Sequence, residues 1–312
     1  FFFDENVLVK RYTRPRENMI NSEIPTSSTL ASLNFPSDVL CIAFQFIPLG
    51  ELYRNAVFVC QEWRSVADSE AFWKCGLSSA VINALNNGQG ALTMKGLYIS
   101  AMLKNRIRNP RFTEGYSDPG WKVMATPGDR YTIPQWEVSG HSVVVENPPI
   151  GVCATSAQAA LPCVATSYGW GKLHQDINLS DAPASVLCQC AQPIALRFHC
   201  SGRSDQLGHF NVNIGLLNAD GLSVYRWTSE RHKLSNAVFQ EFVHVIQHYP
   251  KDAYTMQLVL EGKDSSFWSG YYGAKFSDIS LRFVKHSEVA SLKEHNGWLG
   301  GKVTMGPGAG VL

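Results

Sequence analysis

The 312-residue sequence lacks an excess of charge of either sign. Lys and Arg together number 27 and Asp and Glu number 26, so the formal net charge is +1 at pH 7. Proteins that bind nucleic acid through broad electrostatic contacts usually carry a basic face or a strongly basic domain. The charge balance therefore argues against nucleic-acid binding. The one local basic patch that it leaves open consists of Lys104, Arg106, Arg108 and Arg111.

Long apolar runs are missing as well. No stretch approaches the roughly 20 apolar residues that a membrane helix needs, so we expect no membrane span. Phe1-Phe2-Phe3 is followed at once by Asp4 and Glu5, which excludes it as the apolar part of a signal peptide. The chain begins at Phe1 rather than at Met, which fits a fragment or a gene-model product whose upstream targeting information is missing.

Cys-x-x-Cys pairs, which mark many zinc and redox sites, are absent. The Cys188-x-Cys190 pair, with His199 and Cys200 nearby, has the spacing of neither a zinc ribbon nor a zinc finger. We therefore expect no metal and no cofactor. The eight cysteines are interpreted as buried reduced thiols in a chain large enough to fold without disulfides. This usage favours a cytoplasmic or nuclear location.

Catalytic motifs are also missing. The sequence has no Gly-x-Ser-x-Gly, no His-Glu-x-x-His and no phosphate-binding loop. Paired carboxylates would mark a glycoside hydrolase, but Asp176, Asp181, Asp205 and Glu261 form no recognisable motif. We expect no catalytic residues. Glycoside hydrolysis is kept as an alternative that would require turnover of a sugar substrate by one of these carboxylates.

The amino-acid composition changes along the chain. The first 32 residues are polar, with Pro15, Pro25 and a Thr-Ser-Ser-Thr run, which is typical of a disordered arm. From residue 109 onward Pro and Gly become frequent and short β-rich runs appear. The predicted organisation is a disordered arm (1–32), a small helical domain (33–79), a helical linker (80–108), a β-sandwich domain (109–286) and a flexible tail (287–312).

The helical domain shows amphipathic patterning. Apolar residues recur at i, i+3, i+4 and i+7 from Val39 to Phe46, Pro48 ends this helix, and a second run extends from Leu52 to Trp63. Three short helices cannot bury every large apolar side chain in so small a unit. Some of these side chains should therefore remain exposed for a partner surface. The alternative is a plain helical bundle whose apolar residues are all core.

The same segment resembles the F-box motif. Its matching features are Phe35-Pro36-Ser37-Asp38-Val39-Leu40, Phe46-Ile47-Pro48, Trp63-Arg64 and Phe72-Trp73, with Phe-Pro in place of the usual Leu-Pro. The resemblance implies docking to the Skp adaptor and, through it, to the cullin scaffold of an SCF-type ubiquitin ligase. The residues expected to bind the adaptor are Phe35, Pro36, Leu40, Ile47, Pro48, Leu52, Val57 and Val59.

The β-rich domain shows alternating strands. Apolar residues at alternate positions share one face from Ile194 to Phe198 and from Met256 to Leu260, and turn residues separate the strands. Short strands with such spacing predict a sandwich or a barrel. Trp121 and Trp136 are expected in its core.

This second domain resembles the F-box-associated (FBA) domain, a jelly-roll-like, galactose-binding-like β-sandwich. The most telling match is the run from Glu261 to Gly273, which contains Asp264-Ser265-Ser266-Phe267-Trp268-Ser269-Gly270 and looks like the signature loop of that family. Further matches lie at 120–123, 128–130, 136–138, 164–168, 177–179, 192–194 and 201–205. Residues 139–163 are longer than the family pattern, which suggests an inserted loop near the pocket.

Members of the family that bind glycoproteins recognise the inner chitobiose of high-mannose N-glycans on misfolded proteins. Carried over residue by residue, the resemblance implies sugar contacts by Tyr168, Phe267 and Trp268 and by the acidic Asp205. Ser269 stands where the best sugar binders have Lys, a departure that removes a long donor. The fold class expected is thus α + β and multidomain: a small helical F-box followed by an antiparallel β-sandwich.

Alternatives stay open for each of these residues. Phe267 and Trp268 could be sandwich core, although neighbours in a strand point to opposite faces. Asp205 could be only a turn residue paired with Arg203, and Tyr168 could be a loop-packing aromatic. The functional alternatives are an SCF receptor for clients without glycans and a lectin-like module that acts without the adaptor.

Overall fold

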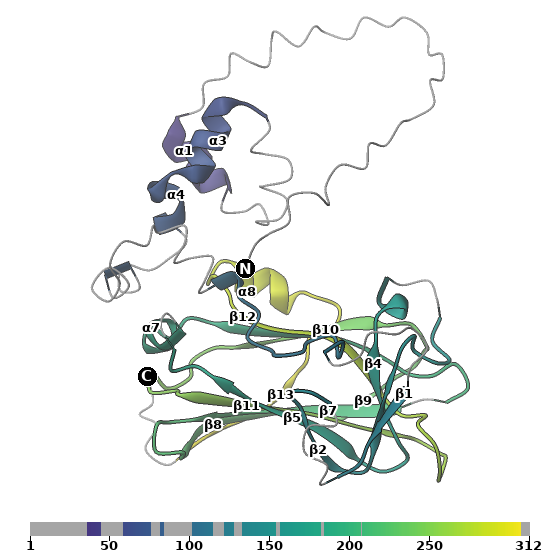
Figure 1. Ribbon diagram of the computed structural model, residues 1–312. Coiled ribbons are helices and arrows are strands. Elements are labelled where there is room, and N and C mark those ends of the chain that lie inside the picture. The colour runs from purple at the N-terminus through teal and green to yellow at the C-terminus, as the bar shows by residue number, and fades with distance from the viewer. Residues whose placement is uncertain are drawn as a thin grey trace, which may run out of the picture.

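The computed structural model describes two parts of the chain, a group of helices and a β-sandwich (Figure 1). The described residues are 36–44, 59–75, 82–83, 102–114, 122–127, 133–153, 157–181, 184–206 and 208–306. The predicted fold class, a small helical unit followed by an antiparallel sandwich, is confirmed. The predicted arm over 1–32 and the predicted core residue Trp121 lie outside the described residues.

The helical part packs around aromatic side chains. Its helices are α1 (Ser37–Phe44), α3 (Gln61–Asp68) and α4 (Glu70–Cys75). The ring of Phe44 meets Trp63 at 5.2 Å and Phe72 at 6.2 Å, both edge-on. Ser69 separates α3 from α4, and its Oγ accepts a hydrogen bond from Phe72 N at 3.2 Å, as an N-cap does. Burial of one aromatic cluster thus holds the three helices together.

The sandwich consists of two antiparallel sheets. The first has the order β1-β3-β4-β12-β6-β10, and its strands are Lys122–Ala125, Val143–Glu146, Cys163–Thr166, Lys275–Phe283, Ile194–Ser201 and Gln240–Ile246. The second has the order β13-β8-β7-β11-β5-β2, and its strands are Gly301–Met305, Ser223–Ser229, Gly208–Leu217, Thr255–Asp264, Gly171–Asn178 and Glu137–Gly140. The short β9 (His232–Lys233) pairs with β7.

The core lies between the two sheets and follows the alternation in the sequence. Along β7, the residues Phe210, Val212, Ile214 and Leu216 are fully buried while their neighbours are half-buried. Phe198 of β6 meets Phe210 across the interior at 5.8 Å. Trp136 is buried as predicted, and its Nε1 donates to Asn109 O at 3.2 Å. Opposite faces of β7 therefore meet the core and the outside, as period-2 patterning requires.

The prediction of a flexible tail over 287–312 is wrong for residues 288–305. Helix α8 (Glu288–Lys293) packs on the outer face of the first sheet, where Val289 and Leu292 join Val243 in a small apolar cluster. Strand β13 then pairs with β8 at the edge of the second sheet. This segment is ordered by its contacts with strands that are distant in the sequence, and such contacts cannot be predicted from local composition.

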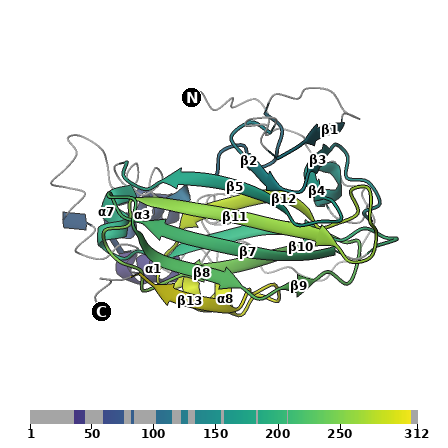
Figure 2. The ribbon, with the colours of Figure 1, turned by 90° about the horizontal axis from the view of Figure 1, so that it is seen from below.

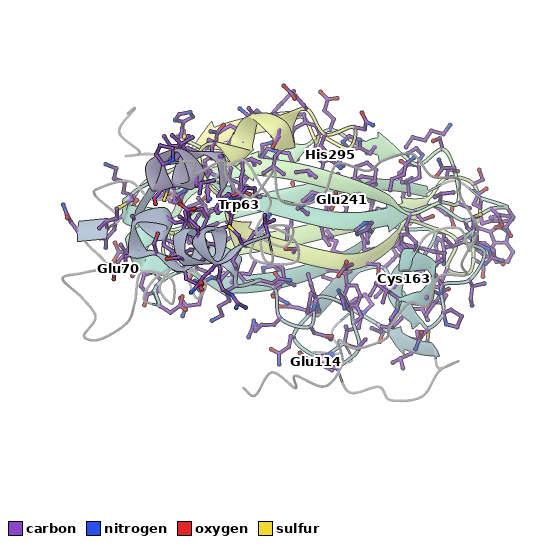
Figure 3. The ribbon with its side chains drawn as sticks, turned by 90° about the horizontal axis from the view of Figure 1, so that it is seen from above. Trp63, Glu70, Glu114, Cys163, Glu241 and His295 are labelled. Carbon is purple, nitrogen blue, oxygen red and sulfur yellow. The ribbon has the colours of Figure 1, made fainter. Side chains whose placement is uncertain are left out.

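A polar contact reinforces the packing of the tail. Glu241 of β10 accepts from the Arg197 guanidinium at 2.8 Å and lies 3.0 Å from His295 Nε2, side by side with His295 in Figure 3. Leu299 N donates to Val243 O at 2.8 Å. The tail thus crosses from one sheet of the sandwich to the other.

The predicted helical linker over 80–108 lies mostly outside the described residues, and it is not helical over 104–108. Instead this segment joins the sandwich: Arg106 N donates to Leu281 O at 2.8 Å, and the Arg106 guanidinium binds both carboxylate oxygens of Asp181 at 2.8 and 2.9 Å. Arg111 pairs with Asp278 at 2.8 Å. Lys104 Nζ lies 3.9 Å from Asp181 Oδ2, so three of the four residues in the local basic patch pair with acids of the sandwich.

The packing of His244 against Trp298 of the C-terminal segment should make the stability of the fold sensitive to acid. The His244 ring is buried between Trp227, at 3.6 Å, and Trp298, at 5.4 Å, and burial lowers the pKa of His244 to about 4. The unfolded chain binds this proton near pH 6.5, so stability is complete above that pH and falls as the pH drops towards 4. We expect a loss of about 2–3 kcal/mol between pH 7 and 4.5 from this group.

Urea unfolding at several pH values measures this effect. Burial also lowers the pKa values of His199, His209 and His232, so the wild-type loss should exceed the contribution of one histidine. The control is His244→Phe, which keeps an aromatic ring and removes the titration. An equal acid sensitivity in this variant would contradict the assignment to His244.

Candidate functional site

Three loops of the sandwich meet at one end of the molecule, which we call the loop end. They are the β4–β5 loop (167–170), the β6–β7 loop (described over 202–206) and the β11–β12 loop (265–274), and they lie on the right of Figure 2. The strand register requires this meeting, because Asp264 pairs opposite Gly208, Gly262 opposite Gly171, and Lys275 opposite Ser201. All residues predicted to bind sugar lie on these loops.

Asp264 shapes the β11–β12 loop. Its carboxylate is buried, and Oδ1 accepts hydrogen bonds from Ser266 N and Phe267 N at 3.0 Å each. Asp264 N donates to Ser167 O at 3.0 Å, which ties this loop to the β4–β5 loop. An Asp that binds the backbone two and three residues ahead forms a local turn. Asp264, which the sequence did not single out, therefore fixes the base from which the aromatic residues project.

The aromatic pair of the β11–β12 loop faces solvent. Trp268 is 85% exposed and Phe267 is 47% exposed, so the alternative that they form sandwich core is wrong. Phe267 rests on the Tyr272 ring at 4.9 Å. Gly270 has φ +84°, and a Cβ there would lie 2.3 Å from Tyr272, so only glycine lets the loop turn back over that ring. The loop thus supports Phe267 from below and presents Trp268 freely.

Tyr168 stands on the adjacent β4–β5 loop. Its side chain is 45% exposed, and its ring packs edge-on against His141 at 4.9 Å. Gly169 makes room for this packing, since a Cβ there would lie 2.1 Å from the His141 ring. Tyr168 therefore both packs on a loop and offers an exposed aromatic surface, at the same end as Trp268.

Asp205 lies in the turn of the β6–β7 loop, with Arg203 Nε 2.8 Å from its Oδ1. The Arg203 guanidinium in turn covers the Tyr272 ring at 4.2 Å. The turn pairing that the sequence suggested is thus present, and it connects Asp205 through Arg203 and Tyr272 to Phe267. Gln206 Nε2 donates to Ser265 Oγ at 3.1 Å and joins the same two loops. Ser269 is exposed beside Trp268.

A buried ion pair anchors the segment that follows β3. Lys275 Nζ and Glu146 Oε2 are 2.6 Å apart, and both side chains are almost fully buried. Glu146 Oε2 also accepts from Ile150 N at 2.9 Å. Gly151 O then accepts from Ser204 N at 2.8 Å, so the anchored segment braces the loop of Asp205. That residues 139–163 hold an insertion stays a prediction. The sequence showed no sign of this pair, whose members come from different strands.

The environment of this pair keeps a neighbouring thiol protonated. Burial raises the pKa of Cys163 to about 12, and its Sγ lies 3.9 Å from Glu146 Oε2 as a donor.

Within the described ranges, no group of three or more His, Cys, Asp or Glu side chains is arranged to hold a metal ion. None of the helices described has the length and apolarity to span a membrane.

The predicted adaptor residues fall into three groups. Pro36 and Val59 are exposed, as expected for a partner surface. Leu40 is only 4% exposed and belongs to the helical core, so its assignment to an exposed surface is wrong: position 40 faces the Phe44 cluster. The others lie outside the described residues: Phe35, Ile47, Pro48, Leu52 and Val57.

The structure adds two exposed apolar residues that the sequence did not assign to the adaptor surface. Val39 is 48% exposed and Ile42 is 58% exposed, both on helix α1. Ile42 borders a shallow and mostly apolar cavity of about 400 Å³ between the helices, together with Ser37, Cys41, Ser65, Val66, Ser69 and Ala71. Val39 and Ile42 are three residues apart and so lie on the same face of a helix, and this spacing could have identified them from the sequence.

Comparisons with known proteins agree with this architecture. A family model described as the F-box associated region matches residues 98–282, and one described as the F-box domain matches residues 32–75. F-box only protein 6 of Rattus norvegicus is 25% identical over 266 residues, covering 80% of this chain and 86% of that protein. F-box only protein 27 of Mus musculus is 21% identical, covering 79% and 88%.

Among solved structures, TmCBM61 in complex with beta-1,4-galactotriose superposes with a TM-score of 0.33 at 13% identity, covering 58% of this chain and 99% of that chain. The family model for the F-box associated region spans more than half of the 312 residues. The chain therefore belongs to the family of F-box proteins with an F-box-associated domain, and it has the organisation of a substrate-recognition subunit of an SCF-type ubiquitin ligase.

Proposed function

We propose that this chain recruits misfolded N-glycosylated proteins to the ligase by binding the inner chitobiose of their high-mannose glycans at the loop end. The observation that carries this proposal is Trp268, whose side chain is 85% exposed on a loop fixed from within by Asp264. A large aromatic surface that is held out and not used for packing contributes little to folding. Its use is in binding.

The chemistry of the loop end suits a sugar. One face of a hexose ring presents C–H groups, which pack on an aromatic face, while its hydroxyl groups need hydrogen-bond partners. Trp268, Phe267 and Tyr168 supply exposed aromatic surface. The polar partners nearby are Asp205 and the hydroxyl groups of the serines that flank the aromatic pair, with Ser269 where the strongest sugar binders have Lys.

In this proposal the chain binds its partners and catalyses no reaction itself. The F-box would hold the adaptor and the sandwich would hold the client, so that the gain is a high local concentration of client beside the ubiquitin carrier. Trp63 and Glu70 of the helical part lie at one end of Figure 3, and Cys163, close to the loop end, lies towards the other. A client at the loop end would thus stay clear of the adaptor.

Cell location and pathway belong to the same proposal. We place the protein in the cytoplasm or nucleus, acting on glycoproteins discarded from the secretory pathway. Cys60 has an exposed thiol that forms no disulfide, which suits a reducing compartment. Cell fractionation tests the location.

Retention of the full chain on immobilised chitobiose, and on a denatured high-mannose glycoprotein before and after enzymatic removal of its glycans, tests the ligand. We expect retention that disappears with the glycan. Equal retention after glycan removal would instead support a receptor for clients without glycans. Failure to co-purify with the Skp adaptor would leave only a lectin-like module.

Ile42→Asp is expected to weaken adaptor binding tenfold or more in a pull-down with purified Skp adaptor. Ile42 is exposed beside the apolar cavity between the helices, and a charge buried there on binding would lack a partner. The matched control is Leu222→Asp, at a position that is 64% exposed on the sandwich. Equal adaptor binding by the two variants would exclude this surface.

A further inference from the structure

A polar groove crosses the outer face of the second sheet. It consists of two adjoining cavities of about 480 and 350 Å³, which share Lys172 and Glu261 in their linings. Figure 2 looks onto this face, where β5, β11, β7 and β8 lie in front with no helix over them. Neither the F-box nor the aromatic loop end uses the groove.

The floor of the larger cavity contains a glycine that the fold does not require. Gly215 lies in the middle of β7, opposite Gln257 of β11 and Arg226 of β8. Its φ is not in the left-handed region, and a Cβ there would meet only Gln257, at ordinary contact distances of 3.6 and 3.8 Å. Glycine within a strand costs roughly 0.5–1 kcal/mol relative to Ala. Glycine inside a strand is found at bulges, at tight bends and where another molecule approaches the backbone closely. The β7–β8 register shifts one residue further on, between Leu216 and Leu217, while the open space over Gly215 leaves room for a ligand.

The lining indicates the chemical class of that molecule. The carboxylates of Glu137 and Glu261 balance the cations of Lys172 and Arg226 in the larger cavity. Lys172 Nζ already pairs with Glu261 Oε1 at 2.9 Å, and Asn211 Nδ2 donates to Glu261 Oε2 at 2.8 Å. A surface of balanced and fixed donors and acceptors, with few apolar side chains, suits a neutral ligand rich in hydroxyl groups rather than an anion or an apolar peptide.

Trp170 connects the groove to the loop end. It lines the smaller cavity, and its indole lies under the cationic groups of Arg231, at 5.0 Å, and Lys263, at 5.6 Å. Tyr168, two residues earlier on the same loop, packs instead against His141 at the loop end. One oligosaccharide can therefore contact Tyr168 with its inner residues and pass Trp170 into the groove.

We propose that this groove binds the outer mannose residues of the glycan whose inner chitobiose occupies the loop end. This inference rests on the proposed function, and it assigns the specificity for long high-mannose chains to the second sheet. Gly215 admits the sugar to the floor of the groove. The polar side chains of Asn213, Arg226 and Gln257 would bind its hydroxyl groups.

Calorimetric titration with chitobiose and with a high-mannose oligosaccharide that contains it tests the proposal. We expect the wild type to bind the longer ligand at least tenfold more tightly. Gly215→Val should remove this gain and leave the affinity for chitobiose unchanged, because the added side chain fills the groove without straining the strand. Arg226→Ala, an exposed change that leaves the core intact, is the second variant and should reduce the gain severalfold.

The control is Gly300→Val, at a position where a Cβ would meet nothing within 4 Å. If the wild type bound the two ligands equally, or if both variants kept the tighter binding of the longer ligand, the groove would not be a mannose site. The proposal that the loop end binds chitobiose would be unaffected. Binding of mannose oligosaccharides without binding of chitobiose would overturn the loop end and keep the groove. Binding of neither ligand would overturn both.

Discussion

Trp268→Ala is expected to abolish retention on immobilised chitobiose while leaving the melting temperature unchanged. The indole is 85% exposed, so its removal costs little folding free energy. Aromatic residues at the centre of a binding site typically contribute about 2–4 kcal/mol, which corresponds to a loss of roughly 30- to 1000-fold in affinity. Titration calorimetry and differential scanning calorimetry measure the two quantities on the same sample.

Val303→Ala is the matched control for this variant. Val303 is an exposed apolar residue, 55% accessible, on the edge strand β13, which lies outside the loop end. It should change neither affinity nor melting temperature. A Trp268→Ala protein that still binds chitobiose would exclude the indole as the sugar platform, and a fall of several degrees in its melting temperature would show that Trp268 has a structural role instead.

Lys275→Met should lower the free energy of unfolding by about 3–5 kcal/mol. The lysine is fully buried 2.6 Å from Glu146, so its removal leaves a carboxylate without its cation in the interior of the sandwich. The same carboxylate holds Ile150 N, so the segment that braces the β6–β7 loop should loosen as well. Urea denaturation measures the loss of stability.

The chain contains a matched exposed pair. Lys172 lies 2.9 Å from Glu261, but its side chain is 41% exposed, so Lys172→Met should cost at most about 1 kcal/mol. The double variant Lys275→Met with Glu146→Leu should recover much of the loss, because no buried charge is then left alone. Equal costs for Lys275→Met and Lys172→Met would show that burial of the first pair has no energetic consequence.

Much of the site was accessible from the sequence. Neighbours in a strand point to opposite faces, so the adjacency of Phe267 and Trp268 already argued against both rings entering one core, and the structure leaves both exposed. Leu40 was assigned to the partner surface from its apolar character and its place in the F-box-like motif, and its helix turns it inward. An apolar side chain in a short helix has the same local signature whether it faces a core or a partner, so only packing separates the two.

The amino-acid sequence by itself determined the order of a helical unit and a β-sandwich, the faces of the strands and the loops that carry the aromatic residues. These features depend on periodicity and on turn residues, which act over a few positions. Tertiary structure alone decided the pairing of Glu146 with Lys275, 129 residues apart, the ordering of the tail by His244 and Trp298, and the groove over Gly215. Each of these depends on strands distant in the chain, whose neighbours are chosen by burial and register rather than by local preference.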